Sequence, residues 1–578
     1  MRALAGVVAF AAVACGSGSL AVSARPAATG AGPGFATPEA QSPDVPTWRG
    51  GCFYSGPAGK IVNGSPSPDV RLFGSACATP PGPGGLVYLD RYDPVASTGD
   101  VTVLSSEPGS APVVIARNGG SGTADPASSG ARFDDAQRRV LALADLTFVT
   151  GQLVVAELPA GAPVQVVASG VRVDNYEFVG DGGVIFVGNY DASARQGDLF
   201  YWNGATPQLI AATASRFDFV MYRLDPARSR VAYLRGYTDL AGGDLFVQPV
   251  PPAGAEPAPL ASGVRRMSWT ADGRHLVFRT VSADGITYAL WSWDGEGAPV
   301  QLAPAVASAA VLGNDVLYTT DWSVLTGQAL LHLVSADGGP DLLGAAGPAS
   351  PAYASVQPPG APGELAYLVQ PDAADPFTGD LFVTRLSGSS PARLDTGVSA
   401  RAGYQFSPGG GFVSYAVGFE QPQSPGSANP QPGLAREVRV AGTVAGTPFV
   451  LTRDGSTFVA WDPQERFVAG IADLVPAASY GTLVVSSTAD GARLFSSDRA
   501  GISEFGFAAD GSALWVVHGW DDAMRRGELL LAPTSGPAAW QQAVIAQGVT
   551  AVAGVSAGRV IYCVQGSGRD GLWLGALP

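Results

Sequence analysis

Four segments of the chain repeat one pattern of apolar and polar positions. In each segment, an apolar run ends near an acidic or aromatic turn, and Gly followed by Asp or Glu opens a second apolar run. These segments are residues 183–202, 230–250, 364–386 and 513–533. Short apolar runs bounded by turn residues are typical of antiparallel β-hairpins. The pattern therefore predicts pairs of adjacent β-strands.

The same pattern recurs in weaker form along most of the chain. Weaker copies begin at Leu86, Arg139, His275, Asp315, Phe412, Phe467 and Arg559. With the four clear copies they make eleven units, spaced by about 47 residues on average, and a four-stranded propeller blade takes roughly 40 to 45 residues. The repeat predicts an all-β protein, a β-propeller with four-stranded blades.

The number of units predicts how the chain is divided. Propellers typically have four to eight blades, so about eleven units favour two tandem propellers. We expect a linker at residues 346–363, the most Pro- and Gly-rich connection between complete units. About six units then lie in residues 85–345 and about five in residues 364–578. The last unit lacks a fourth strand, and an N-terminal segment that supplied it would cover an exposed sheet edge.

Residues 131–145 (ARFDDAQRRVLALAD) test the strand prediction. By composition this segment could form a helix, because Asp lies in its first turn and apolar residues follow. Its phase in the repeat instead places residues 133–135 at a blade turn and residues 140–144 in a strand. We follow the phase and predict a strand.

Composition and charge narrow the classes of partner. The chain has 76 Gly and 46 Pro, yet 46% of its residues are hydrophobic, which is enough for a folded core in a turn-rich protein. The formal net charge is −15 and no run of Lys or Arg occurs. Because binding to nucleic acid requires clustered cations, we expect no nucleic-acid partner. The same balance argues against electrostatic docking on anionic lipid.

The N-terminus predicts export. Arg2 precedes a short apolar stretch, residues 3–14, which has the features of a secretory signal peptide and is too short to span a bilayer. The end of this stretch and Cys15 resemble a bacterial lipobox, although Ala12 stands where Leu is usual. The resemblance implies cleavage after residue 14 and lipidation of Cys15, and an ordinary signal peptide cleaved nearby remains the alternative. Gly16 would then favour an outer-membrane lipoprotein of a Gram-negative bacterium, held to the membrane by its lipid anchor only.

The next two segments are interpreted as a tether and a cysteine-containing segment. Residues 15–47 are rich in Gly, Ala, Pro and Ser, so they are expected to form a flexible tether. Residues 48–84 contain Cys52 and Cys77, and in an exported protein we expect these two to form a disulfide. Cys563 lies in an apolar run and is interpreted as a buried thiol. His275, His332 and His518 fall in separate repeats and no zinc spacing occurs, so we predict no metal and no cofactor.

The turns before several apolar runs resemble those of a known family. The patterns WTADG at 269–273, FAADG at 507–511 and FSPGG at 406–410 resemble the Ser-Pro-Asp-Gly turn of the TolB-like, WD40-like (PD40) β-propeller repeat family. Asp-Gly and Pro-Gly suit a tight turn with left-handed backbone. The resemblance covers residues 85–578 and implies the propeller fold. It says little about the ligand, because one fold hosts many functions.

One short motif and one pair of acidic residues resemble catalytic groups. Gly554, Ser556 and Gly558 match the pattern of a nucleophile elbow, which requires a strand, a turn, a helix and a later histidine. This copy falls between two expected strands and no histidine follows His518. Asp521 and Asp522 could serve glycoside chemistry, but a structural role in the turn is the default interpretation. We predict no catalytic residues.

The hairpins between second and third strands repeatedly pair an acid with an aromatic residue. In a propeller these hairpins lie on one face, and aromatic side chains near hydrogen-bonding groups suit the recognition of sugars or peptides. The candidate recognition residues are Tyr92, Asp93, Tyr190, Asp191, Tyr237, Asp239, Asp321, Trp322, Trp520 and Asp521. The alternative is that the acids form the turns while the aromatic residues cover the edge of the hairpin.

Together these features predict a non-enzymatic binding or scaffolding lipoprotein of the cell envelope. Its expected partner is an envelope protein or glycan, recognised through one face of a propeller. The alternative is an envelope enzyme, a polysaccharide lyase or glycosidase, that uses the propeller as a platform. Clustering of Asp522, Glu528 and an Arg or Tyr at the central mouth of one ring would favour this enzyme.

Overall fold

The computed structural model describes most of the chain after residue 84 and two short strands before it. The described residues are 59–60, 71–72, 85–93, 98–105, 112–119, 131–134, 138–147, 149–157, 164–173, 175–194, 196–215, 222–238, 240–254, 257–282, 287–323, 328–343, 349–356, 363–369, 377–386, 390–420, 434–444, 446–475, 480–521, 523–524, 526–556, 559–564 and 571–576. The expected signal peptide, the tether, Cys15, Cys52 and Cys77 lie outside them. Within these residues no helix is long and apolar enough to cross a membrane.

The described residues form β-strands and one short 3-10 helix, η1 (Ala400–Ala402). The strands of the first half are β1 (Gly59–Lys60), β2 (Arg71–Leu72), β3 (Gly85–Asp93), β4 (Thr98–Ser105), β5 (Val113–Gly119), β6 (Arg132–Phe133), β7 (Arg139–Ala144), β8 (Thr150–Glu157), β9 (Gln165–Arg172), β10 (Tyr176–Phe178), β11 (Val184–Asp191), β12 (Gln196–Trp202), β13 (Gln208–Ser215), β14 (Tyr222–Leu224), β15 (Arg230–Thr238), β16 (Gly242–Pro249), β17 (Ala261–Trp269), β18 (Leu276–Val281), β19 (Tyr288–Trp293), β20 (Val300–Val306), β21 (Ser308–Leu312), β22 (Asp315–Ser323) and β23 (Gln328–Ser335). The strands of the second half are β24 (Ala349–Val356), β25 (Glu364–Val369), β26 (Thr378–Arg385), β27 (Ala392–Ser399), β28 (Tyr404–Phe406), β29 (Phe412–Glu420), β30 (Leu434–Gly442), β31 (Phe449–Ser456), β32 (Val459–Trp461), β33 (Phe467–Val475), β34 (Tyr480–Ser487), β35 (Arg493–Ser496), β36 (Ala500–Phe507), β37 (Ala513–Asp521), β38 (Arg526–Pro533), β39 (Ala543–Ser556), β40 (Arg559–Val564) and β41 (Gly571–Ala576).

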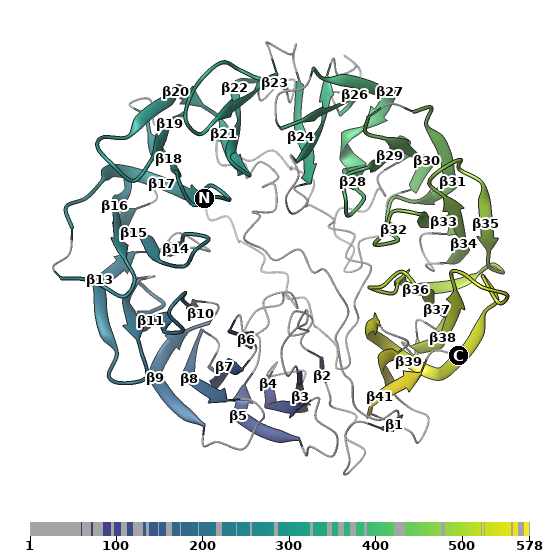
Figure 1. Ribbon diagram of the computed structural model, residues 1–578, viewed down its shortest axis with the longest axis horizontal. Helices are drawn as coiled ribbons and strands as arrows, with labels where there is room; N and C mark the ends of the chain where they lie inside the picture. The colour runs from purple at the N-terminus through teal and green to yellow at the C-terminus, as the bar shows by residue number, and fades with distance from the viewer. Residues whose placement is uncertain are drawn as a thin grey trace, which may run out of the picture.

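The strands pair with their neighbours in sequence to form antiparallel units of four. In the unit β10 to β13, each strand pairs with the next, and the units β2 to β5 and β6 to β9 follow the same order. Figure 1 shows the units arranged around a ring, with the first strand of each unit, such as β6, β10 and β14, on the inner side. This radial arrangement of antiparallel four-stranded units is the β-propeller architecture. The all-β prediction is confirmed.

The segment 131–145, whose composition also suits a helix, contains strands β6 and β7. Residues 139–144 are strand β7, and the backbone N–H of Asp134 donates to the carbonyl of Arg139 across the preceding turn. The strand is buried from Val140 to Leu143. The phase of the repeat, rather than helix-forming composition, therefore predicted this segment correctly.

Hydrogen bonding crosses the segment predicted to separate two propellers. Residues 349–356 of that segment form β24, which pairs with β23 through Ala329 and Ala349 and with β25 along most of its length. In Figure 1 the units on both sides of β24 follow one another around a single ring. The prediction of two tandem propellers joined by a linker at residues 346–363 does not agree with this arrangement, because the segment itself is a strand of the ring.

The two ends of the described chain meet in the last unit. β1 pairs with β41 antiparallel, with Gly59 opposite Leu574 and Lys60 opposite Trp573. An early strand thus lies on the outer edge of the unit formed by β39, β40 and β41. The expected completion of the last unit by an N-terminal segment is present, and it covers part of an edge whose backbone groups would otherwise be exposed.

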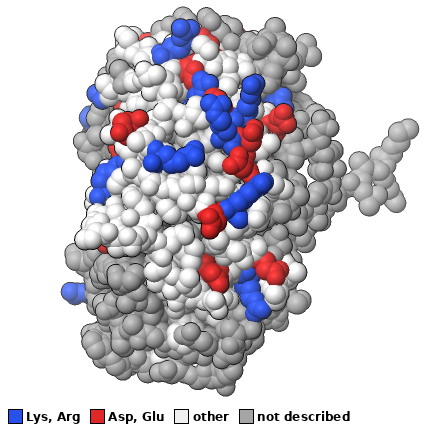
Figure 2. Space-filling view, turned by 90° about the vertical axis from the view of Figure 1, so that its right-hand side faces the viewer, with Lys and Arg blue, Asp and Glu red and all other residues white. Residues whose placement is uncertain are grey.

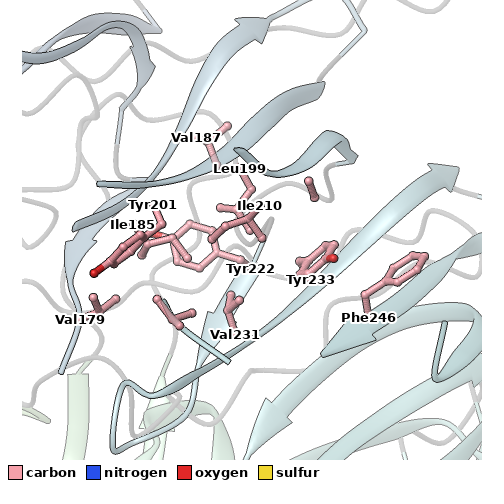
Figure 3. Close-up of a cluster of buried hydrophobic side chains, with 12 residues drawn as sticks. Val179, Ile185, Val187, Leu199, Tyr201, Ile210, Tyr222, Val231, Tyr233 and Phe246 are labelled. Carbon is pink, nitrogen blue, oxygen red and sulfur yellow. The ribbon is translucent and has the colours of Figure 1, made fainter. Parts of the chain in front are cut away.

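The hydrophobic core lies between consecutive units rather than inside each one. Figure 3 shows one cluster in which Ile185 and Leu199 of one unit meet Val231 and Tyr233 of the next. Tyr233 is fully buried and stacks on Phe246 with ring centroids 5.5 Å apart. Because a four-stranded sheet presents apolar side chains on both faces, each unit is stable only against its neighbours.

The turn between the first and second strands of a unit, here called the inner turn, is built on an aspartate. Asp225 accepts from the backbone N–H groups of Ser229 and Arg230 at 2.7 and 2.9 Å, and from Nε of Arg230 at 3.0 Å. The same guanidinium donates to the carbonyl of Gly273 in the inner turn of the next unit. It also lies 4.5 Å above the ring of Trp269. The inner turn therefore fixes its own loop and joins two units.

Candidate functional site

The hairpin between the second and third strands, here called the middle hairpin, contains a β-bulge in unit after unit. The strand register shifts between Gly188 and Asp191, between Arg235 and Thr238, and between His518 and Asp521. The first residue of the bulge has left-handed backbone; its φ is 50° at Asn189 and 61° at Gly519. A bulge adds a residue to one strand and redirects the side chains that follow.

The aromatic residue that follows the left-handed position points into the core. Tyr237 is buried with 8% of its surface exposed. Tyr190 packs against the cluster that contains Ile185 and Leu199, and the guanidinium of Arg172 lies 4.9 Å from its ring. Trp520 packs against the cluster formed by β37, β38 and the strands that follow. These three rings therefore serve the packing between units.

The glycine that opens the third strand is required by the bulge. A Cβ atom on Gly243 would lie 2.8 Å from the carbonyl oxygen of Arg235, and one on Gly527 would lie 2.8 Å from that of His518. On Gly197 it would lie 2.9 Å from the carbonyl oxygen of Gly188. Real Cβ atoms do not come this close to backbone, so only glycine fits beneath the bulge. The repeated glycine in the sequence is thus explained by local packing.

The acidic residues of the middle hairpins close the turns. Asp191 accepts from the backbone N–H groups of Ser193 and Ala194 at 2.8 and 3.1 Å and from the hydroxyl of Ser193 at 2.6 Å. The hydroxyl bond, followed by the backbone bonds, lowers the pKa of Asp191. Asp521 accepts from the N–H groups of Ala523 and Met524. Asp321 occupies the left-handed position itself, with φ of 51°.

The structure describes the remaining candidate residues only in part. Tyr92 and Asp93 end β3 and Trp322 lies in β22, but their side chains are outside the described part of the structure, as is Asp239 altogether. For Tyr190, Asp191, Tyr237, Trp520 and Asp521 the geometry matches the structural alternative stated above. A recognition role for this face stays a prediction.

The catalytic alternatives have structural explanations as well. Ser556 ends β39 and pairs with Arg559 at the start of β40, so its motif joins two strands and lacks the helix of a nucleophile elbow. Glu528 lies on β38 and accepts from Nε2 of Gln547 at 2.9 Å, and Asp522 lies outside the described residues. Among the described residues, no group of three or more metal-ligating side chains occurs.

A group of charged side chains lies on the inner strands of three consecutive units. Arg132 comes from β6, Glu177 from β10, and Tyr222 and Arg223 from β14. Figure 1 places these three strands side by side on the inner edge of the ring. We call these four residues the inner-strand cluster.

Tyr222 interacts electrostatically with the other three residues of the cluster. Burial raises the pKa of Tyr222 well above its usual value, and the charge of Glu177 and a hydrogen bond to it raise it further. The charges of Arg132 and Arg223 act on the same hydroxyl in the opposite direction. Nε of Arg223 is buried and makes no hydrogen bond to the described residues. A buried donor without a partner is costly unless another group supplies the acceptor.

The sequence carries no signal for the inner-strand cluster. β6, β10 and β14 have only two or three residues each, too few to show a period. Arg132, Glu177 and Arg223 lie about 45 residues apart in the chain. Only their equivalent places in successive units bring them together.

The outer side of the ring has mixed charge. Figure 2 shows Arg and acidic side chains interleaved on one side rather than gathered into a patch of one sign. On β30, Glu437 contacts Arg439 at 2.6 Å, and it also contacts Arg453 of β31 at 2.6 Å. Arg439 reaches Asp395 of the preceding unit at 2.8 Å. Hydrogen bonding to Arg439 lowers the pKa of Glu437.

Comparison with known proteins finds structural likenesses only. No family model matches the sequence, and no curated protein matches it. A crystal structure of the eukaryotic initiation factor covers 69% of this chain and 94% of its own at 11% identity, with a TM-score of 0.41. The tricorn protease covers 85% of this chain and 60% of its own at 10% identity, with a TM-score of 0.25. A putative TolB from Agrobacterium tumefaciens covers 40% of this chain and 84% of its own at 14% identity, with a TM-score of 0.22. At such scores these likenesses carry no argument, and the fold rests on the strand topology.

Proposed function

We propose that the protein is an exported binding or scaffolding protein of the cell envelope that recognises a protein or glycan partner at the centre of its ring. The inner-strand cluster is the single observation that carries the proposed binding site. Its two guanidinium groups, carboxylate and phenol converge from three units, and Nε of Arg223 has no acceptor among the described residues. Convergent polar groups on a rigid scaffold are typical of binding sites.

The finer features of the proposal come from the sequence. The ring is proposed to be a TolB-like propeller of eleven units, and Cys15 is proposed to carry the lipid that anchors it to the outer membrane. The tether of residues 15–47 would hold the ring away from the membrane surface. A disulfide between Cys52 and Cys77 is part of the same proposal, since such bonds persist in exported proteins.

Crosslinking in intact cells tests the binding function. Partners captured by the unaltered protein are compared with those captured by Arg223→Met, which keeps most of the side chain's bulk and removes its charge. Arg274→Met, at an exposed arginine of an inner turn, is the matched control. We expect Arg223→Met to lose the partner and Arg274→Met to retain it. Equal capture by both variants would overturn recognition at the inner-strand cluster, and capture of nothing by the unaltered protein would overturn the binding function.

Fatty-acid labelling tests the anchor independently. The protein is expressed with a labelled fatty acid, and the membrane and soluble fractions are separated. We expect label in the mature protein and release of Cys15→Ala from the membrane. A mature protein without label, or a Cys15→Ala variant that stays on the membrane, would contradict the lipoprotein proposal.

A further inference from the structure

In one unit, a hydroxyl, an imidazole and a carboxylate group are joined by hydrogen bonds. Thr320 lies on β22, His332 on β23, and Asp341 in the segment that follows β23. In the ladder between the two strands, Tyr318 is opposite His332 and Thr320 is opposite Leu330. Thr320 and His332 are therefore diagonal neighbours on the same face of the sheet, within reach of each other's side chains.

The distances between these side chains are those of hydrogen bonds. Oγ1 of Thr320 lies 2.9 Å from Nε2 of His332, and Nδ1 of His332 lies 2.9 Å from Oδ2 of Asp341. A carboxylate only accepts, so Asp341 places the imidazole proton on Nδ1. Nε2 is then left with a lone pair facing the threonine hydroxyl. This is the relation of nucleophile, base and orienting acid that activates hydroxyl nucleophiles.

Asp341 and the imidazole are held in place by their surroundings. Oδ1 of Asp341 accepts from the backbone N–H groups of Leu333 and Leu343 at 3.1 and 3.0 Å, which leaves Oδ2 for the histidine. The imidazole stacks on Tyr318 with ring centroids 4.8 Å apart and planes 14° from parallel. A fixed ring orientation is what a general base needs.

The local environment is apolar but not closed. Tyr318 belongs to a buried cluster with Leu290 and Ala303 of the preceding unit. Burial, followed by the charge of Asp341, raises the pKa of Tyr318. The side chains of His332 and Asp341 keep 21% and 24% of their surface exposed, so both remain in contact with solvent.

The other described histidines lack this arrangement. Nε2 of His275 contacts Asp337 at 3.0 Å, but its own backbone carbonyl, not its ring, meets the hydroxyl of Thr270. His518 lies on β37 opposite Glu528 and Ile502 in the strand ladders. His518 is therefore a suitable control position for His332.

We propose that Thr320 is a nucleophile activated by His332 and Asp341, and that this site hydrolyses small carboxylic esters. Oγ1 attacks the carbonyl carbon while its proton passes to Nε2 of His332. The bond from that carbon to the alcohol oxygen then breaks, and the leaving alcohol takes the proton from the imidazolium. Water, deprotonated by the same imidazole, next attacks the acyl carbon. The bond from that carbon to Oγ1 breaks, the acid is released, and the imidazolium returns its proton to Oγ1. The activity goes beyond the proposed binding function, and either can fail without the other.

Acetylation by p-nitrophenyl acetate tests the proposal on the full chain. Release of p-nitrophenol gives the rate, and peptide mass spectrometry locates the acetyl group. Background acetylation of lysine is confined to one residue, since Lys60 is the only lysine of the chain. We expect an acetyl group on Thr320 of the unaltered protein. A map with acetyl groups elsewhere and none on Thr320 would overturn the proposal.

Variants separate catalysis from a structural role of the same hydrogen bonds. Thr320→Val keeps the shape of the side chain and is expected to abolish the acetyl group at this position, whereas Thr320→Ser is expected to restore it. His332→Gln is expected to lower the acetylation rate roughly 100-fold, and His518→Gln is the matched control with an unchanged rate. Equal rates for His332→Gln and His518→Gln, with both proteins folded by circular dichroism, would show that the hydrogen bonds only stabilise the unit.

Discussion

Asp225 in an inner turn and Asp191 in a middle hairpin both accept backbone hydrogen bonds, but their consequences for the ring differ. Asp225 is buried and holds Arg230, whose guanidinium reaches the carbonyl of Gly273 in the next unit. Asp462 and Arg466 repeat this arrangement, and Arg466 reaches the carbonyl of Gly511 at 2.8 Å. Asp191 is exposed and bonds only within its own turn. The aspartate of the inner turn therefore couples neighbouring units, whereas Asp191 closes only its own turn.

The largest effect is expected from Asp225→Ala. The substitution leaves the N–H groups of Ser229 and Arg230 and the guanidinium of Arg230 without their acceptor. Loss of one partner from a buried ion pair with hydrogen bonds costs about 3 kcal/mol. We expect a decrease of this size in the free energy of unfolding, measured with urea. Asp294→Ala, at an exposed turn, is the control. Equal losses in the two variants would break the distinction between buried inner turns and exposed turns.

A smaller loss is expected from Gly481→Ala, which tests the middle hairpin. A Cβ atom at this position would lie 2.9 Å from the carbonyl oxygen of Ala472, beneath the bulge at Asp473. Relief of this overlap requires the hairpin to move, at about 2 kcal/mol. Gly446→Ala is the control, because the nearest atom to its Cβ lies 3.8 Å away. A tolerated Gly481→Ala would mean that the bulge does not require glycine.

Glu504→Gln is expected to change how the stability of the protein depends on pH. Glu504 lies on β36, outside the inner turns and the middle hairpins. Burial raises the pKa of Glu504 from 4.5 to about 8, partly opposed by the N–H of Val552. A raised pKa means that the folded protein holds the proton more tightly than the unfolded chain. The stability that this proton provides is complete below about pH 4.5 and is lost as the pH rises through about 8.

The variant and its control make this linkage measurable. Glutamine does not ionise, so Glu504→Gln is expected to lose less stability than the unaltered protein between about pH 5 and pH 8.5. Glu296→Gln, at an exposed turn, is expected to keep the original pH dependence. Urea midpoints at the two pH values provide the measurement. Identical pH dependence in all three proteins would show that groups other than Glu504 cause the pH dependence of stability.

The smallest effect is expected from Asp191→Asn. The lowered pKa of Asp191 means that its contribution to stability is present above the unfolded pKa and is lost as the pH falls through the folded one. The side chain is exposed, so solvent screens the interaction and the shift in unfolding midpoint at neutral pH should be slight. A loss as large as that of Asp225→Ala would show that Asp191, too, supports more than its own turn.

The candidate sites show where sequence patterns stop being informative. The pairing of acids with aromatic residues suggested a recognition face, yet Tyr237 is buried and Asp191 closes its own turn. The reason is the bulge, which turns the aromatic side chain inward and depends on three-dimensional register. No sequence pattern marks Arg132 and Arg223, because charged residues on strands of two or three residues form no pattern.

The sequence by itself determined the strands, the unit of four and the turn residues. Alternation and the repeat predicted β7 against a helical composition, and the glycines with left-handed backbone at 273 and 511 lie in the expected turns. These features depend on interactions between residues near in sequence. The tertiary structure alone decided that β24 continues one ring, that Arg132, Glu177 and Arg223 converge, and that Thr320 meets His332 and Asp341. The angle and register at which units pack set these relations, and neither is encoded in a local pattern.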